Sequence, residues 1–301
     1  MRWAGLGSAV IVCLALAVAG CGSSQTQASS ASPLPTPGGM RPDKALVVVE
    51  ENHTEASALG GMPYLASLAD THGQTTAYRA VSHPSLPNYL ALVGGSTFGV
   101  TDDRPPADHP VTGDSVLDLT IAAGATAKAY LEDMPGPCTL ESTGDYAVKH
   151  NPWAYFADQA ARRNCQTSDQ PAGTPTSGAL HDDVQAGTLP TVGILIPNMC
   201  HDAHNCPLSA ADDWLQQWLP AIMHGPDYRA GHLAIVITFD EDDRSGANTV
   251  LTTVIAPTVR HVISATPLTH YSLTRYLAGL SATPPPGQAA TAPSLGDAFG
   301  I

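Results

Sequence analysis

Acidic and amide side chains follow two apolar runs of this sequence. Glu51 and Asn52 come after "ALVVV", and Asp240 and Glu241 come after "AIVITF". Carboxylate and amide oxygens are ligands for hard divalent cations. We therefore expect these four residues to hold one or more divalent metal ions. The alternative for "DEDD" is a solvated acidic turn, and for "ENH" an ordinary loop.

A single serine, Ser85, stands between two prolines in "SHPSLPNYLALVGG". Pro87 suits the first turn of a helix, and Gly94 and Gly95 can end that helix. Ser85 would then lie at or just before a helix N-terminus, where free N–H groups favour negative charge. The serine could simply cap the helix, or it could be a nucleophile that attacks phosphorus. Because the metal-ligand candidates also follow strands, we favour the nucleophile.

Two histidines follow a third apolar run. After "GILIP" the chain continues with Asn198 and then His201, Asp202 and His204. Imidazoles near a reacting phosphate can hold its oxygens or protonate the departing oxygen. The alternative is that both histidines are surface residues with satisfied hydrogen bonds.

Strands and helices that alternate along the chain would position these residues. The apolar runs are continuous, which is typical of strands buried on both faces of a parallel sheet, and they lie at 45–50, 126–131, 191–197, 232–240 and 250–257. Helices are expected at 63–72, 87–93, 115–123, 152–163, 210–223 and 272–280. This order predicts an α/β fold, a three-layer sandwich with a mostly parallel central sheet. Ligands of such sheets bind beyond the carboxyl ends of the strands.

The ends of the chain differ in composition from its middle. Residues 1–21 are expected to be a signal segment that resembles a bacterial lipobox, with Cys21 lipidated. Residues 22–42 are rich in Ser, Thr, Pro and Gly and are expected to form a flexible tether. The folded domain is expected at 43–280, followed by a loose Pro- and Ala-rich tail at 281–301.

Charge and cysteine content limit the class of protein. A net charge of −14 argues against a nucleic-acid binder. Beyond the signal segment, four cysteines in an exported chain favour two disulfides over a zinc site. Three pairings are possible, of which we favour Cys138–Cys165 and Cys200–Cys206.

Six motifs in order resemble the bacterial phosphoesterase family of the alkaline phosphatase superfamily: "VVVEENHT", "SHPSLPNYLALVGGST", "YAVKHNPWAYF", "PNMCHDAHNC", "ITFDEDD" and "THYSLTRYL". The family includes acid phosphatases and phosphatidylcholine-type phospholipases C. The resemblance covers about residues 45–280. It implies an alkaline-phosphatase-like sandwich and metal-assisted hydrolysis of phosphate esters through a hydroxyl nucleophile.

The resemblance also implies roles for individual residues. The family's Glu-Asn pair falls on Glu51 and Asn52, and its later acidic pair falls on Asp240 and Glu241. In acid phosphatases of the family that later pair is commonly two aspartates, so Glu241 departs from the pattern.

The family's nucleophile falls on Ser85, whose "SLPN" setting is similar to the "TFPN" of nucleotide pyrophosphatase relatives. Ser82 is an alternative that lacks the Pro-Asn helix start. Further residues are expected around the phosphate or as additional metal ligands: His201, Asp202, His204 and His270, with His150 and Lys149 as possible phosphate contacts or wall residues.

These expectations together describe an exported enzyme that is anchored to the outer face of the membrane through Cys21, or secreted. The leading function is a metal-dependent phosphomonoesterase that acts on a small phosphorylated substrate through a phosphoserine. The alternative is a phospholipase C or another phosphodiesterase, whose family members usually carry C-terminal domains that are not seen here. A non-catalytic, ligand-binding lipoprotein is a third hypothesis.

Overall fold

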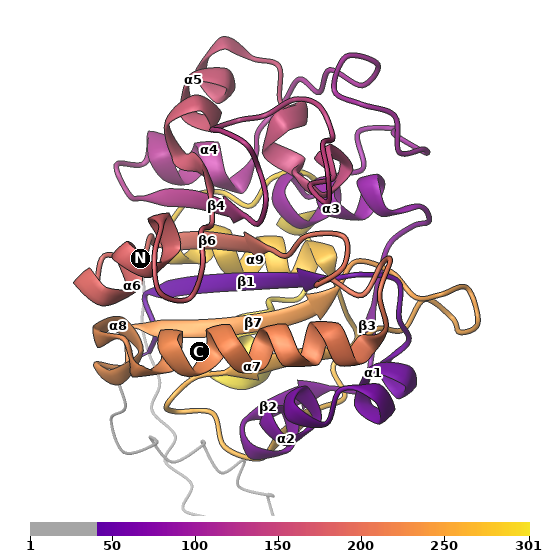
Figure 1. Cartoon of the computed structure of the whole chain (residues 1–301), viewed down its shortest axis with the longest axis vertical. Helices are drawn as coiled ribbons and strands as arrows, with labels where there is room; N and C mark the ends of the chain where they lie inside the picture. The colour runs from indigo at the N-terminus through magenta and orange to yellow at the C-terminus, as the bar shows by residue number, and fades with distance from the viewer. Residues whose placement is uncertain (1–40) are drawn as a thin grey trace, which may run out of the picture. The chain divides into compact units, whose positions relative to one another are not determined.

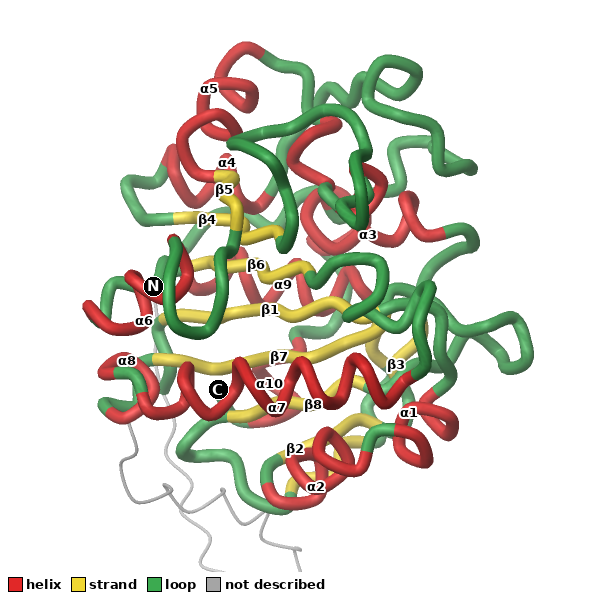
Figure 2. The backbone as a smooth tube through the Cα atoms, in the orientation of Figure 1, coloured by secondary structure: helices red, strands yellow, loops and turns green. Residues whose placement is uncertain are grey.

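The computed structural model describes residues 41–301 (Figures 1 and 2). Eight strands form one sheet in the order β5-β4-β6-β1-β7-β8-β2-β9. Their bounds are β1 Lys44–Glu50, β2 Gly73–Thr75, β4 Ala127–Leu131, β5 Asp169–Pro171, β6 Val192–Ile196, β7 Leu233–Phe239, β8 Thr252–Ile255 and β9 Val262–Ser264. A second sheet pairs β3 (Tyr78–Arg79) with β10 (Leu268–Thr269). The predicted signal segment, with Cys21, and most of the tether lie outside the described residues.

The centre of the sheet is parallel, as the continuous apolar runs predict. β1 lies between β6 and β7, with Val47 paired to Ile194 on one side and to Val236 on the other. β6 and β7 are buried throughout, which explains why neither run alternates with polar residues. β8 is antiparallel to β7 and to β2. The segment between β7 and β8 contains no helix, and a parallel crossover usually includes one.

Helices cover both faces of the sheet and complete a three-layer sandwich (Figure 1). α7 (Leu208–His224) lies on one face with α1 (Glu55–Gly61) and α2 (Pro63–Thr71). α9 (His270–Leu280) lies on the other with α3 (Ser85–Gly94) and α4 (Val116–Ala122). The remaining helices are α5 Gln159–Ser168, α6 Ala179–Ala186, α8 Pro226–Arg229, α10 Leu295–Phe299, and the 3-10 helices η1 Val148–His150, η2 Pro152–Tyr155 and η3 Gly287–Ala290. Within residues 41–301, none of the helices combines the length and the apolar character needed to cross a membrane.

One helix that the sequence predicts is divided in the structure. The expected helix at 152–163 is η2 followed by α5, with Phe156, Ala157 and Asp158 between them. The Val111 N–H donates to the Tyr155 carbonyl at 2.9 Å, and the Ala157 N–H donates to the Val111 carbonyl at 2.8 Å. These bonds pair residue 156 with the loop at Val111, and that extended pairing interrupts the helix.

The C-terminal segment 281–301 is folded, which differs from the loose tail that its composition predicts. It forms η3 and α10, and it buries Leu295, Phe299 and Ile301. The Gln288 N–H donates to the Gly95 carbonyl at 2.8 Å, which fixes η3 against the end of α3. Three apolar side chains in an otherwise small-residue segment are sufficient to attach it to α9 and β9.

Candidate active site

The carboxyl ends of β1 and β7 bring two of the predicted metal ligands together. Glu50 pairs with Phe239 in the parallel register, so Glu51 and Asp240 leave the sheet side by side. The Asn52 N–H donates to Asp240 Oδ1 at 3.0 Å, and the Glu241 N–H donates to the same oxygen at 2.6 Å. One carboxylate oxygen of Asp240 therefore orders both strand ends, while the other is left for a different partner.

Ser85 is the first residue of α3 and contacts this acidic edge. Its Oγ donates a hydrogen bond to Glu51 Oε2 at 3.0 Å, and the residue is 2% exposed. Pro84 is the N-cap of α3, and no side chain caps that helix, so the capping interpretation of Ser85 is wrong. The alternative serine, Ser82, donates instead to the carbonyl of His83 at 3.2 Å. The structure thus brings Ser85 to the carboxylates.

Asn88 ties the segment that contains Ser85 to Glu241. Its Oδ1 accepts from the N–H groups of Val81 and Ser82 at 3.1 and 3.0 Å. Its Nδ2 donates to Glu241 Oε2 at 3.0 Å and also reaches the carbonyls of Ser82 and Pro84. The sequence reasoning used Asn88 only as part of a helix start. The "SLPN" motif is the signal that could have identified it.

His150 reaches the same cluster from η1. Its Nε2 lies 3.1 Å from Glu51 Oε1, and its Nδ1 lies 3.1 Å from Asp202 Oδ2. Its ring stacks on Tyr89 of α3 with the centroids 5.0 Å apart. The predicted pair His150 and Asp202 therefore lies beside Ser85 and Glu51. Tyr89 is a neighbour that the sequence analysis did not identify.

Lys149 and His204 lie at the border of the cluster. Lys149 Nζ donates to His204 Nε2 at 3.2 Å and to Asp103 Oδ2 at 3.3 Å. The other oxygen of Asp103 accepts from the Leu86 N–H at 2.9 Å, directly after Ser85. Asp103 is a second neighbour that sequence reasoning missed, because its run "TDDRPP" reads as an ordinary acidic loop.

Two predicted histidines have other contacts. His201 Nδ1 lies 2.9 Å from Glu132 Oε2, and its ring stacks on Trp214. The buried His270 donates from Nε2 to the backbone carbonyl of Asp240 at 2.6 Å and accepts from the Tyr78 hydroxyl at 3.1 Å. His270 thus uses both ring nitrogens to hold the Asp240 backbone, which differs from the expected place around the phosphate.

Burial dominates the electrostatics of the cluster. It raises the pKa of Asp240 to about 6, of Asp202 to about 7 and of Glu241 to about 9, with repulsion from Asp240 adding to the last. It also raises the pKa of Glu51 well above its usual value, with repulsion from Asp240 and Asp202 as further causes. The buried atoms Glu51 Oε1 and Asp240 Oδ2 accept no hydrogen bond. Buried carboxylate oxygens without donors are a set that a hard divalent cation fits.

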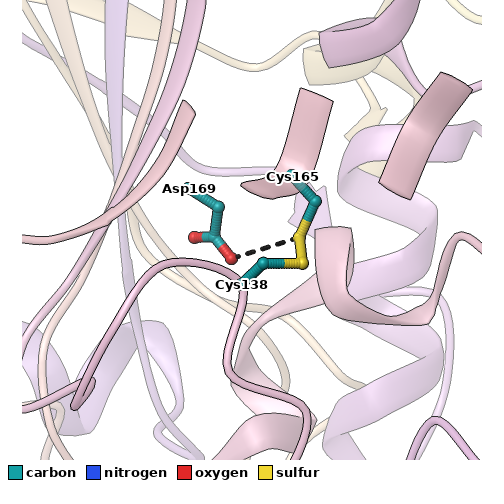
Figure 3. Close-up of side chains that lie close together, drawn as sticks. All are labelled: Cys138, Cys165 and Asp169. Carbon is teal, nitrogen blue, oxygen red and sulfur yellow. Dashed lines mark hydrogen bonds between the residues drawn. A yellow bond between two sulfur atoms is a disulfide. The ribbon is translucent and has the colours of Figure 1, made fainter. Parts of the chain in front are cut away.

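Across residues 41–301, one group brings three His, Cys, Asp or Glu ligand atoms within 4.8 Å of one another: Cys138, Cys165 and Asp169 (Figure 3). Its two sulfurs form a disulfide, so neither is a thiolate that could bind a metal. The carboxylates of Glu51, Asp240 and Glu241 are more widely spaced than that. The predicted pairings Cys138–Cys165 and Cys200–Cys206 are both confirmed.

Comparisons with known proteins identify the family of the chain. The model of the Phosphoesterase family matches residues 55–246. The chain is 32% identical over 261 residues to a phosphatidylinositol-3-phosphatase of Mycobacterium tuberculosis, covering 85% of this chain and 82% of that protein. It is 30% identical to a phosphate-repressible acid phosphatase of Penicillium chrysogenum, covering 72% of this chain and 53% of the other. The chain thus spans about half the length of that fungal relative.

Solved structures share the architecture at low sequence identity. An alkaline phosphatase superfamily protein from Vibrio parahaemolyticus matches with a TM-score of 0.56 at 11% identity, covering 86% of this chain and 72% of that one. A lipoteichoic acid synthase from Listeria monocytogenes matches with a TM-score of 0.54 at 9% identity, covering 83% and 76%. At such identities the likeness shows the fold, and the chemistry has to be argued from the side chains.

Proposed function

The chain belongs to the Phosphoesterase family and is a hydrolase of phosphoric esters, and we propose that within this class it is a metal-dependent phosphomonoesterase with Ser85 as its nucleophile. One observation carries the proposal. The Ser85 hydroxyl, 2% exposed, donates to Glu51 Oε2 at 3.0 Å beside the Asp240 and Glu241 carboxylates and at the N-terminus of α3.

The residues that would hold the cation are Glu51, Asn52, Asp240 and Glu241. Their oxygens have the chemistry that divalent cations prefer, and the buried Asp240 Oδ2, which accepts no hydrogen bond, supports this assignment. A bound divalent cation supplies positive charge that lowers the pKa of a nearby hydroxyl and neutralises phosphoryl oxygens. The His270 ring, which donates to the Asp240 carbonyl at 2.6 Å, acts as a positioning residue for this set.

The reaction has two balanced steps. In the first, Ser85 Oγ forms a bond to phosphorus while the bond from phosphorus to the ester oxygen breaks, and Glu51 Oε2 is the acceptor for the serine proton. The departing alcohol takes a proton from the Lys149–His204 pair, in which the Lys149 ammonium is the donor to His204 Nε2 at 3.2 Å. In the second step, a water oxygen forms a bond to phosphorus while the bond from phosphorus to Ser85 Oγ breaks, and phosphate is released. Glu51 returns its proton to Ser85 Oγ, and the proton lost by the water replaces the one given to the alcohol.

Other groups hold the phosphate during this exchange. The N-terminus of α3 presents backbone N–H groups and a positive dipole end beside Ser85. The Lys149 ammonium supplies a positive charge at the border of the cluster. His150 and Asp202 contact the cluster next to Glu51 and are assigned to substrate binding.

A pair of serine variants tests the nucleophile. We expect Ser85→Ala to lower kcat/KM for phenyl phosphate by at least about 1,000-fold, and Ser82→Ala, the matched control, to change it by less than about threefold. Mass spectrometry after acid quenching should find the phosphoryl group on the peptide that contains Ser85. A folded Ser85→Ala protein with normal turnover contradicts the assignment.

Metal dependence and substrate class need separate assays. Prolonged dialysis against a chelator should remove activity, and a divalent cation should restore it. Phenyl phosphate, bis(4-nitrophenyl) phosphate and phosphatidylcholine should be compared on the same protein, and the monoester should be hydrolysed fastest. Preference for the diester or the phospholipid would favour the phosphodiesterase alternative. A folded, metal-loaded protein that hydrolyses none of them would favour the ligand-binding lipoprotein.

We also propose export and lipid anchoring through Cys21. The disulfides Cys138–Cys165 and Cys200–Cys206 support an oxidising compartment. In cells fed labelled palmitate, the chain should acquire label and Cys21→Ser should not. Equal labelling of the two chains would contradict the anchor.

A further inference from the structure

A cavity of about 790 Å³ borders the candidate active site. It lies between the loops 103–107 and 140–149, and Met199 and Asn205 also line it. Two of its lining residues contact the site. Asp103 accepts from the Leu86 N–H next to the nucleophile at 2.9 Å, and Lys149 lies 3.2 Å from His204. We refer to this cavity as the side pocket.

The walls of the side pocket are mainly apolar. The apolar lining residues include Pro105, Pro106, Leu140, Val148 and Met199. Four charged residues also line the pocket: Asp103 and Lys149, which contact the site, and Glu141 and Arg162. Leu140 is 40% exposed, one of two large hydrophobic side chains in residues 41–301 that reach that degree of exposure. An apolar wall next to a charged border is complementary to a ligand with one charged end and one apolar end.

Hydrogen bonds hold the walls in place. The Tyr146 hydroxyl donates to the Thr139 carbonyl at 2.8 Å, and the Tyr155 hydroxyl donates to the Arg104 carbonyl at 3.1 Å. The Met199 N–H donates to the Asp145 carbonyl at 3.0 Å, which joins the disulfide loop 200–206 to the loop 140–149. The side pocket is therefore braced by both flanking loops.

We propose that the side pocket binds the alcohol part of the ester, and that the enzyme selects phosphate monoesters of bulky apolar alcohols over those of small ones. The inference rests on the proposed function, since it assumes that phosphate is bound at Ser85. With the phosphoryl group there, the ester oxygen faces the border formed by Asp103 and Lys149. The alcohol then extends along the apolar walls, and a cavity of about 790 Å³ accommodates a fused ring system.

The test compares two monoesters whose leaving groups have similar acidity and differ by one ring, phenyl phosphate and 2-naphthyl phosphate. Burying the additional ring is expected to give the wild type about a tenfold higher kcat/KM for the naphthyl ester. Ala107 is exposed and lines the side pocket, so Ala107→Trp fills the cavity without altering the core. Ala230→Trp places the same side chain on an exposed residue just before the amino end of β7 and is the control.

We expect Ala107→Trp to abolish the preference for the naphthyl ester while inhibition by inorganic phosphate changes by less than about twofold, because the phosphate site is untouched. Leu140→Ser should reduce the preference by about threefold. Ala230→Trp should leave it unchanged. A preference that survives Ala107→Trp, or equal losses on both esters, overturns the inference while the proposed function stands. A wild type that hydrolyses neither ester overturns the proposed function and the inference with it.

Discussion

The carboxamide of Asn88 offers the sharpest test of how the nucleophile is positioned. Asn88→Asp keeps the volume and the acceptor for the N–H groups of Val81 and Ser82, but it replaces the Nδ2 donor with an oxygen. That oxygen would face Glu241 Oε2 at 3.0 Å and the carbonyls of Ser82 and Pro84, all of which are acceptors. Three lost hydrogen bonds and a second buried carboxylate should lower the free energy of unfolding by about 3–5 kcal/mol.

Two measurements on the same variant check this reasoning. The midpoint of thermal unfolding should fall by about 10 °C, given about 2–4 °C per kcal/mol for a domain of this size. In the folded fraction, kcat/KM for phenyl phosphate should fall at least about 100-fold, because Ser85 and Glu241 lose their common anchor. Gln217→Glu makes the same chemical change on the exposed face of α7 and should alter stability by less than about 0.5 kcal/mol. An Asn88→Asp protein with wild-type stability and activity would refute the positioning argument.

Three further outcomes follow from the structure. Burial raises the pKa of Asp169 from 3.8 to about 7, so the folded state binds the proton more tightly than the unfolded state does. The free energy of unfolding should therefore fall by up to about 4 kcal/mol as the pH rises from about 4 to 7. Urea unfolding of Asp169→Asn should lack this loss. Asp103→Asn removes a negative charge from the Leu86 N–H, and inorganic phosphate should therefore inhibit about three- to tenfold more strongly in a competition assay. Replacing Cys200 and Cys206 with serine opens a loop with a sequence separation of 6 and should cost about 2 kcal/mol in urea unfolding.

The parallel core was predictable because it depends on a local property of the sequence. The residues of β6 and β7 are buried on both faces, and a strand in that position is apolar at nearly every residue. The direction of β8 was not predictable in the same way. Its residues at 252–255 are just as buried, and the local pattern does not record that the connection after β7 lacks the helix of a parallel crossover.

The candidate site likewise contains residues whose positions could be predicted from the sequence and residues whose positions could not. Glu51 and Asp240 were predictable because strand ends in parallel register must meet. His270 was chosen for its residue type, and residue type does not specify which way a side chain points. Its place between Tyr78 and the Asp240 carbonyl depends on how α9 packs, which the sequence pattern does not record. Asp103 lies far along the chain from Leu86 in a loop without periodicity, so no pattern could have joined them.

The charges around Ser85 argue that this cluster is maintained for chemistry and not for stability. Burial raises the pKa values of Glu51, Asp202, Asp240 and Glu241, which means that their ionised forms oppose folding. A cluster that served only the fold would be expected to pair them with lysine or arginine, and within residues 41–301 no such side chain forms an ion pair with any of the four. A bound divalent cation would favour the ionised form of each of these carboxylates. Binding a divalent cation should therefore stabilise this domain, and the same charge should make the Ser85 oxygen reactive.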